Sequence, residues 1–269
     1  MYSYLFLKDL SLFDYDNLFC TFEPLKISIY DNIIQAKAEN KKGIAVLVDP
    51  DDISEERCIH LARTAQETKI SYFFVGGSLL TGDKLERVVL LLKEHCSIPI
   101  LLFPGSHSHI TSQADALLFL SLISGRNAEY LIGQHVLAAP SIKRSGLETI
   151  PTGYILIDSG LPTTVSYVSN TQPIPANKPE IAACTALAGE LLGLKLFYLE
   201  AGSGAKNPVS KEMIVATRKA IAAPLIVGGG IKSLEAAQQA FEAGADIIVI
   251  GTAIEENASF LNELGKLAV

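Results

Sequence analysis

The chain has 269 residues, of which 49% are hydrophobic and 19% charged, and its formal net charge is -7 at pH 7. This length is enough for one large hydrophobic core, and α/β barrels commonly reach it as single domains. The acidic balance argues against a nucleic-acid or anionic-membrane surface, because such partners favour a basic protein face. Any anionic substrate must therefore be held by local donors or by a metal ion.

The four cysteines show no CxxC or CxH spacing: Cys20, Cys58, Cys96 and Cys184. This pattern is typical of packing thiols in a reduced compartment, and no signal peptide opens the chain, so we expect a cytoplasmic protein. The longest apolar runs, such as residues 88–92, are far shorter than the roughly 20 residues that a membrane span requires. We therefore expect no transmembrane segment.

Residues 1–42 do not repeat the pattern of the rest of the chain. An aromatic, loop-like start precedes a predicted helix from Tyr30 to Asn40, in which apolar residues recur at helical spacing. We expect this segment to be an N-terminal extension that packs on a main body formed by residues 43–269.

From Gly43 onward, short apolar runs alternate with amphipathic stretches, which is typical of βαβ units and a parallel sheet. The expected strands are Ile44–Val48, Ser71–Val75, Ile98–Leu102, Ala116–Leu120, Tyr154–Ile157, Leu196–Leu199, Leu225–Val227 and Ile247–Ile250. Eight strands in this order favour a closed (β/α)8 barrel over an open doubly wound sheet. Residues 43–269 are therefore predicted to form one barrel domain.

The connection between the third and fourth expected strands is unusually short. Residues 103–115 include Pro104, Gly105 and several small polar residues, and they are too few and too broken for a full crossover helix. A barrel without this helix has a gap in its outer ring. Very apolar strands flank the gap, so it could take a long apolar ligand. The alternative is a short helical turn packed in the usual place.

A second irregular segment covers residues 158–178, with three prolines and no sustained periodicity. Long structureless loops in compact domains are often lids or binding loops, and this one follows a strand on the same side as the glycine-rich stretches described below. The alternative is a variable surface loop or a short hairpin at Val165–Val168.

Two early strands end in residues that suit a metal ion. Asp49 closes the first expected strand, where barrel active sites lie, and carboxylate oxygens there suit Mg²⁺ if the substrate brings phosphates. Ser78 follows the second strand and adds a hydroxyl group beside the expected metal ion. The alternative is that Asp49, Asp51 and Asp52 only form the turn before the next helix, and that Ser78 is an ordinary loop serine.

The most informative stretch runs from Tyr198 to Ala205, where an apolar run ends in Glu200 and then in a loop of small residues. Glycine lets the main chain approach an anion closely, and successive N–H groups form a concavity for phosphate. Two later runs, residues 226–231 and 248–252, also break into glycine. These three strand ends suggest one phosphate site, in which Glu200 acts as general base for a substrate hydroxyl. The alternative is a charge-paired glutamate that orients the loop.

The sequence lacks the motifs of several other chemistries. Its five histidines show no HExxH or paired metal spacing. It also has no GxSxG and no P-loop, and the glycine triplet at 228–230 is not GxGxxG. Serine hydrolase, NTPase and dinucleotide-dependent oxidoreductase activities are therefore disfavoured.

Several phrases occur together in one order along residues 43–269. They are Val48-Asp49-Pro50-Asp51, Val75-Gly76-Gly77-Ser78, Ser124-Gly125-Arg126-Asn127 through Tyr130 to His135, Tyr198-Leu199-Glu200-Ala201-Gly202-Ser203-Gly204-Ala205, Val227-Gly228-Gly229-Gly230-Ile231 and Gly251-Thr252. With this ordered set the chain resembles the geranylgeranylglyceryl phosphate synthases. The run that begins at Tyr198 is the most specific of the phrases.

The resemblance implies a modified barrel without its third helix. It also implies transfer of a prenyl group, typically geranylgeranyl, from its diphosphate to the 3-hydroxyl of sn-glycerol 1-phosphate, with release of pyrophosphate for ether phospholipid synthesis. Leu47 stands where a bacterial branch has a lysine, two residues before the aspartate, which suggests the larger, mostly archaeal-like branch (group II). Because members of that branch include dimers and hexamers, a homo-oligomer is expected.

The resemblance also assigns roles to residues. Asp49 and Ser78 would bind the Mg²⁺ of the diphosphate, and Glu200 would take the hydroxyl proton. The residues expected to hold glycerol phosphate are Tyr198, Leu199, Glu200, Ala201, Gly202, Ser203, Gly204, Gly228, Gly229, Gly251 and Thr252.

Two other functions remain open from the sequence alone. One is a different phosphate-binding barrel enzyme, such as a sugar-phosphate isomerase or aldolase. That reading would need a second acid or base, or a Schiff-base lysine, at a strand end, and no expected strand ends in lysine. The other is a non-catalytic lipid-precursor binding protein with the same pocket.

Overall fold

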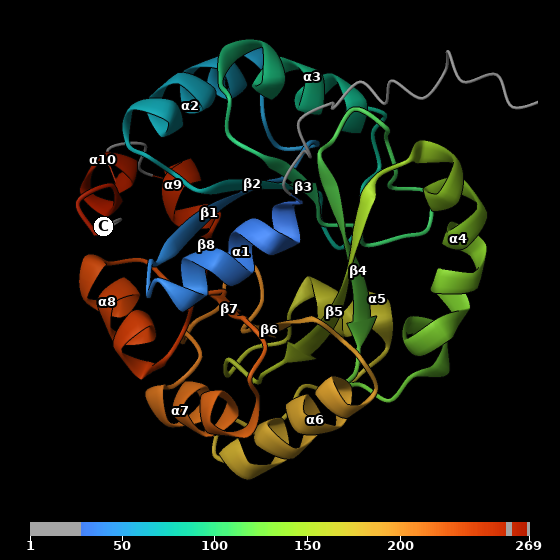
Figure 1. Ribbon diagram of the computed structural model, residues 1–269, viewed down its shortest axis with the longest axis vertical. Helices are drawn as coiled ribbons and strands as arrows, with labels where there is room; N and C mark the ends of the chain where they lie inside the picture. The colour runs from blue at the N-terminus through green and yellow to red at the C-terminus, as the bar shows by residue number, and fades with distance from the viewer. Residues whose placement is uncertain (1–27, 257–259, 268–269) are drawn as a thin grey trace, which may run out of the picture.

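The computed structural model describes residues 28–256 and 260–267. In these ranges eight parallel strands pair in chain order and close into a barrel. They are β1 (Gly43–Val48), β2 (Tyr72–Val75), β3 (Ile100–Leu102), β4 (Ala116–Leu122), β5 (Glu148–Leu156), β6 (Leu196–Glu200), β7 (Leu225–Gly228) and β8 (Ile247–Ile250). Helices form a ring around the strands (Figure 1). The predicted (β/α)8 barrel is confirmed.

The helical segments of the described chain are α1 (Ile29–Ala38), α2 (Glu55–Glu67), α3 (Leu85–His95), a π-helical turn η2 (Glu129–Gly133), α4 (Gln134–Ser145), α5 (Thr164–Ser169), α6 (Pro179–Leu191), α7 (Lys211–Ala220), α8 (Leu234–Ala243), α9 (Thr252–Glu256) and α10 (Phe260–Leu264). Local chemistry sets several of their ends. The hydroxyl of Ser54 accepts the Arg57 amide, and that of Ser233 accepts the Ala236 amide, so each serine caps a helix. Gly244, at a φ of 117°, ends α8.

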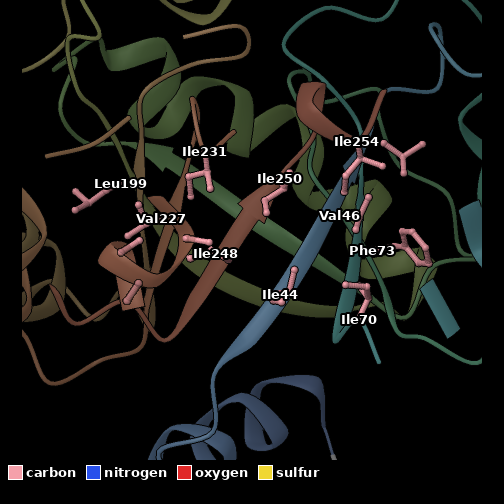
Figure 2. Close-up of a cluster of buried hydrophobic side chains, with 14 of the residues drawn as sticks. Ile44, Val46, Ile70, Phe73, Leu199, Val227, Ile231, Ile248, Ile250 and Ile254 are labelled. Atoms are coloured by element: carbon pink, nitrogen blue, oxygen red, sulfur yellow. The ribbon is translucent and has the colours of Figure 1, made fainter. Parts of the chain in front are cut away.

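Alternation along the strands divides the core into two clusters. One lies between the barrel and its helices, where Ile44, Val46 and Leu199 pack (Figure 2). The other fills the barrel itself and includes Tyr154 and Tyr198. Because side chains alternate in direction, every second residue of a strand points into the barrel. An inward-facing polar residue at the end of a strand therefore lies at the mouth of the barrel.

The expected gap in the outer ring is present. Residues 103–115 join β3 to β4 through turns and bends and contain no helix. The alternative of a short helical turn at this position is therefore wrong. The neighbouring helices α3 and α4 lie on either side of the gap (Figure 1).

Helix α1 lies across the barrel end where the strands begin (Figure 1). Its Ile29 and Ile33 side chains join the cluster inside the barrel. The carboxylate of Glu148, at the start of β5, accepts the backbone amides of Ile29 and Tyr30 at 2.6 and 2.8 Å. The division into an extension of residues 1–42 and a barrel stays a prediction, and the aromatic, loop-like start lies outside the described residues.

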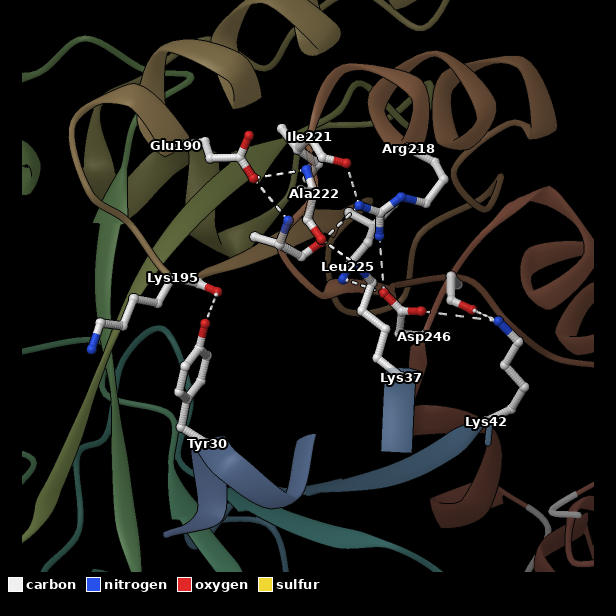
Figure 3. Close-up of polar contacts among 12 residues, drawn as sticks. Tyr30, Lys37, Lys42, Glu190, Lys195, Arg218, Ile221, Ala222, Leu225 and Asp246 are labelled. Carbon is white, nitrogen blue, oxygen red and sulfur yellow. Dashed lines mark hydrogen bonds and ion pairs between the residues drawn. The ribbon is translucent and has the colours of Figure 1, made fainter. Parts of the chain in front are cut away.

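Around the same end, polar contacts join the strand starts to α6 and α7. Asp246 accepts from Arg218 and Leu225, and the Glu190 carboxylate accepts the amides of Ala222 and Ala223 (Figure 3). This network fixes the loops that lead into β7 and β8.

The irregular segment 158–178 contains a helix where a hairpin was one alternative. Residues 165–168 lie in α5, so the hairpin is wrong. A capping box explains the helix, because the Thr163 side chain accepts the Ser166 amide while the Ser166 side chain accepts the Thr163 amide. Ile157 and Ile174 then pair as a single parallel bridge and close the segment into a compact loop.

Three of the four cysteines lie in the described part of the chain. Cys58 is buried, Cys96 is partly buried and Cys184 is exposed, whereas Cys20 lies outside the described ranges. No helix in the described part of the chain has the length and apolar character that crossing a membrane requires. The cytoplasmic location stays a prediction.

Candidate active site

A polar pocket of about 1100 Å³, open to solvent, lies where the strands end. Most of the residues singled out from the sequence line it. They are Asp49, Ser78, Tyr198, Glu200, Gly202, Ser203, Gly204, Gly229, Gly251 and Thr252. The carboxyl ends of β1, β2, β6, β7 and β8 therefore contribute to one site, which is the usual position of an active site in a barrel of this kind.

Three of the expected residues do not line this pocket. Leu199 and Ala201 belong to the cluster between barrel and helices, because they alternate with Tyr198 and Glu200. Any contact they make with a ligand must come from the backbone. Gly228 lies beneath the pocket, where a Cβ atom would collide with the Tyr198 hydroxyl. Its lack of a side chain gives Tyr198 its space.

Glu200 is the buried acid of the pocket, with only 5% of its surface exposed. Its Oε1 atom accepts the Gly202 amide at 2.6 Å. Burial raises the pKa of this carboxyl, and the Tyr198 hydroxyl and the Gly202 amide oppose the shift. A carboxylate with a raised pKa in a water-poor site is suited to accept a proton.

Two tyrosines of the barrel interior lie beside this acid. Tyr154 and Tyr198 meet edge to face with ring centroids 5.3 Å apart. Burial, followed by the negative charge of Glu200, raises the pKa of both hydroxyl groups well above the usual value. The Tyr198 hydroxyl is buried and close enough to influence Glu200, yet it has no hydrogen bond within 3.5 Å in the described chain. It therefore lies next to the Glu200 carboxylate at the base of the pocket.

The glycine loops need the conformations that glycine permits. Gly202, Gly204 and Gly229 have φ angles of 100°, 68° and 83°. A Cβ atom on Gly229 would collide with the Glu200 carboxylate, so a larger residue would displace the acid. The hydroxyl groups of Ser203 and Thr252 lie 3.5 Å apart and bring the loops after β6 and β8 together.

Asp49 faces the same pocket from the end of β1 and is half-buried. Burial raises the pKa of its carboxyl, while the Asp51 amide, which donates to Oδ1 at 2.9 Å, opposes the shift. Asp51 has a structural role, because its carboxylate accepts the backbone amides of Thr81 and Gly82. Asp51 therefore joins the loops after β1 and β2, whereas Asp49 lines the pocket and also accepts an amide within the turn that follows β1.

An apolar groove of about 820 Å³ continues from this pocket into the gap of the outer ring. Its apolar walls come mainly from β4, α4, α5 and the loop after β3, with Leu117, Phe119, Ala138, Ile142 and Val168 among the lining residues. The predicted opening for a long apolar ligand therefore exists. The groove and the polar pocket share Gly77, Ser78, Phe103, Tyr154 and Val165.

Sequence reasoning does not find several lining residues of the pocket, among them Tyr154, Phe103 and Lys232. The apolar run predicts a strand that begins at Tyr154, whereas β5 begins six residues earlier. Phe103 falls in the predicted loop after the third strand. Lys232 lies two residues after the glycine triplet that begins at the end of β7, and its position after a strand end is the available signal.

Comparisons with known proteins agree with this geometry. Residues 36–267 match the model of the PcrB family. The chain is 52% identical to a geranylgeranylglyceryl phosphate synthase of Chitinophaga pinensis, over 88% of this chain and 94% of the relative. It is 46% identical to the protein of the same name from Pyrococcus furiosus, over 90% of this chain and 96% of the relative.

A solved structure is similar over nearly the whole described fold. It is the (S)-3-O-geranylgeranylglyceryl phosphate synthase of Thermoplasma acidophilum in complex with its substrate sn-glycerol-1-phosphate. The TM-score is 0.84 at 30% identity, and the match covers 90% of this chain and 98% of the other.

Proposed function

The chain belongs to the PcrB family and is a transferase of the geranylgeranylglyceryl phosphate synthase type, and we propose how its residues carry out prenyl transfer to glycerol phosphate. In the proposed reaction, the 3-hydroxyl of sn-glycerol 1-phosphate attacks the first carbon of a prenyl diphosphate, typically geranylgeranyl diphosphate. Pyrophosphate leaves, and the ether product is a phospholipid precursor. One observation carries the proposal: a polar pocket with a buried acid opens directly into an apolar groove.

The shape of the joined pockets matches two anionic groups and one long apolar chain. The prenyl tail occupies the groove between β4 and α4, and its diphosphate lies at the shared residues Gly77 and Ser78. The glycerol phosphate lies across the loops after β6, β7 and β8. Loops after the last strands of such barrels frequently form phosphate sites.

The phosphate of glycerol phosphate is held mainly by backbone amides. Gly204 and Gly229 adopt left-handed conformations, and we assign their N–H groups to the phosphate, whereas the Gly202 N–H donates to Glu200. The hydroxyl groups of Ser203 and Thr252 lie at the same place, and Lys232 adds a positive charge to the pocket. These donors explain how an acidic protein binds an anion.

Glu200 acts as the general base. Its carboxylate is held by the Gly202 amide, and its raised pKa gives it a greater proton affinity than an exposed glutamate has. The Tyr198 hydroxyl, which lies beside this carboxylate and opposes the rise in its pKa, contacts the glycerol phosphate next to it. The attacking hydroxyl is thereby oriented before it loses its proton.

The donors near Asp49 fit Mg²⁺. The described residues contain no group of three or more His, Cys, Asp or Glu side chains arranged to hold a metal, so we expect the substrate to supply some of the ligands. Asp49 and Ser78 offer hard oxygen atoms in one pocket, and Mg²⁺ is commonly bound by one or two carboxylates together with substrate phosphates. When bound, the ion would offset negative charge on the departing diphosphate.

The test is an assay of the purified chain with prenyl diphosphates of several lengths and both enantiomers of glycerol phosphate, with and without Mg²⁺. We expect pyrophosphate release and an ether product only with sn-glycerol 1-phosphate and Mg²⁺. Binding of both substrates without turnover would instead indicate a carrier. Isomerisation of a sugar phosphate without a prenyl donor would indicate a different barrel enzyme.

We also propose that the chain forms a homo-oligomer, a dimer or a hexamer, through the outer face of α6. This helix is apolar on its buried side and on its exposed side, where Ile181, Cys184 and Leu187 are followed by Leu191 and Leu192, which are 80% and 83% exposed. A helix that is hydrophobic all round is normally covered. Replacing Leu191 and Leu192 with glutamate should yield monomers in light scattering, and an unchanged mass would exclude this face.

A further inference from the structure

Three aromatic rings meet beneath the point where the apolar groove joins the polar pocket. Phe103 and Tyr154 line both cavities, and Tyr198 lines the polar pocket. The Phe103 and Tyr154 centroids are 5.8 Å apart, and Phe103 and Tyr198 are 5.6 Å apart. Together with the contact between the tyrosines, these distances define an aromatic triangle at the junction.

The backbone holds Phe103 firmly at this place. Its amide donates to the Val75 carbonyl at 2.9 Å, which extends the pairing of β2 and β3 by one residue. Gly76 has a φ of 148°, and a Cβ atom there would collide with the Phe103 carbonyl. Phe103 is also 8% exposed, so the ring is nearly enclosed but still reaches both cavities.

The junction is where the reacting carbon must lie. A prenyl diphosphate with its tail in the groove and its phosphates at Gly77 and Ser78 places the carbon that joins them at the residues common to both cavities. During transfer, the bond from this carbon to the diphosphate oxygen breaks, and its electron pair leaves with pyrophosphate. The glycerol phosphate oxygen forms the new bond to carbon, and its proton passes to Glu200.

We propose that Phe103 and Tyr154 are catalytic residues that stabilise the positive charge on the allylic carbon through their ring π-systems. This inference rests on the proposed function and deepens it. Aromatic faces attract cations because of the ring quadrupole, and the effect is larger in a site that excludes water. Aliphatic side chains would fill the same space without this attraction.

Fluorinated analogues of phenylalanine at position 103 provide the test. Each added fluorine withdraws electron density from the ring while changing its shape little. We expect kcat to fall stepwise with fluorine number, to about a tenth of the wild-type value for the trifluorinated ring, whereas KM for the prenyl diphosphate changes less. A kcat that is independent of fluorine number would overturn the role of Phe103.

Tyr154 is tested by separating its ring from its hydroxyl. Tyr154→Phe keeps the π-system and should retain most of the turnover, whereas Tyr154→Leu should lower kcat about tenfold. Equal losses in both variants would assign the effect to the hydroxyl and overturn the ring's role. Phe241→Leu, on the outer helix α8, serves as a control for the loss of a packed ring and should leave kcat unchanged.

The outcomes also separate this inference from the proposed function. If the wild-type chain forms no ether product from prenyl diphosphate and sn-glycerol 1-phosphate, the proposed function fails. If the wild type is active and the Phe103 and Tyr154 variants match it in kcat, only the aromatic role fails.

Discussion

Each end of the barrel buries one acidic side chain, and the two ends surround it differently. At the amino end, Asp246 is 8% exposed and accepts from Arg218 at 3.0 Å and the Leu225 amide at 2.9 Å, with the Lys42 ammonium 4.0 Å away (Figure 3). At the carboxyl end, Glu200 accepts the Gly202 amide, and no ion pair involves it among the described residues.

The difference separates folding from chemistry. A buried charge is costly unless cations and hydrogen bonds compensate it. Asp246 has that compensation and anchors the starts of β7 and β8. Glu200 has little of it, so its pKa is raised and its proton affinity remains available for a reaction. Asp49, also at the carboxyl end, shares this raised pKa.

The largest effect that we expect comes from Asp49. Asp49→Ala removes the only carboxylate that we assign to the metal, and loss of that charge stabilisation should lower turnover at least about 10³-fold while the protein stays folded. Pyrophosphate release at varied Mg²⁺ measures this, with circular dichroism to confirm folding. Full Mg²⁺-dependent activity in the variant would remove Asp49 from the metal site.

Glu200→Gln should have the next largest effect. The amide oxygen can still accept the Gly202 N–H, but it cannot take the substrate proton, so turnover should fall about 10²- to 10³-fold. Binding of glycerol phosphate, measured by calorimetry, should change far less. Parallel losses of turnover and binding would point to a binding role and weaken the contrast with Asp246.

At the amino end, the corresponding loss should be one of stability. Asp246→Ala leaves the Arg218 guanidinium without its carboxylate partner and the Leu225 amide without an acceptor, so the free energy of unfolding should fall by about 2–3 kcal/mol. Urea unfolding measures this change. The folded fraction should keep its kcat, and a large drop in kcat at unchanged stability would contradict the division between the ends.

The sequence predicts the parts of the fold and the site that coincide with an apolar run, and it does not predict the parts that depend on a tertiary partner. The barrel follows from eight apolar runs, and Glu200 is found because it directly follows one of them. The first half of β5, Glu148 to Gly153, has no such run. It is a strand because it pairs with the long β4, from Ala116 opposite Glu148 onward. A tertiary partner therefore decides its state, and local propensity does not.

That missed start had a consequence for the site. With the strand taken to begin at Tyr154, this residue falls at the amino end, whereas the full β5 places it near the carboxyl end beside Glu200. Leu199 and Ala201 show the opposite case. A motif read as a continuous run includes them, but strand alternation turns their side chains away from the pocket. The short helix α5 depends on the capping pair Thr163 and Ser166, which apolar periodicity does not reveal.

The smallest effect, and the most direct measure of the contrast, is in pH dependence. Glu200 must be ionised to accept a proton, and its pKa in the folded protein lies above the usual 4.5. As the pH is lowered, kcat/KM should therefore begin to fall at a higher pH than it would if the base were an exposed glutamate. The free energy of unfolding should also depend on pH through the titration of Glu200, and the direction of that dependence follows from the raised pKa. The folded state holds the proton more tightly than the unfolded state, so the favourable contribution is complete below the unfolded pKa. It is lost as pH rises through the folded pKa.

Glu200→Gln has no such titration, so its free energy of unfolding relative to wild type should increase with pH across that window. Urea unfolding of both proteins at a series of pH values measures the difference. A constant difference would mean that the Glu200 carboxyl has the same pKa in the folded and unfolded states. In that case, burial would not raise the proton affinity of Glu200, and the proposed contrast between the two ends would fail.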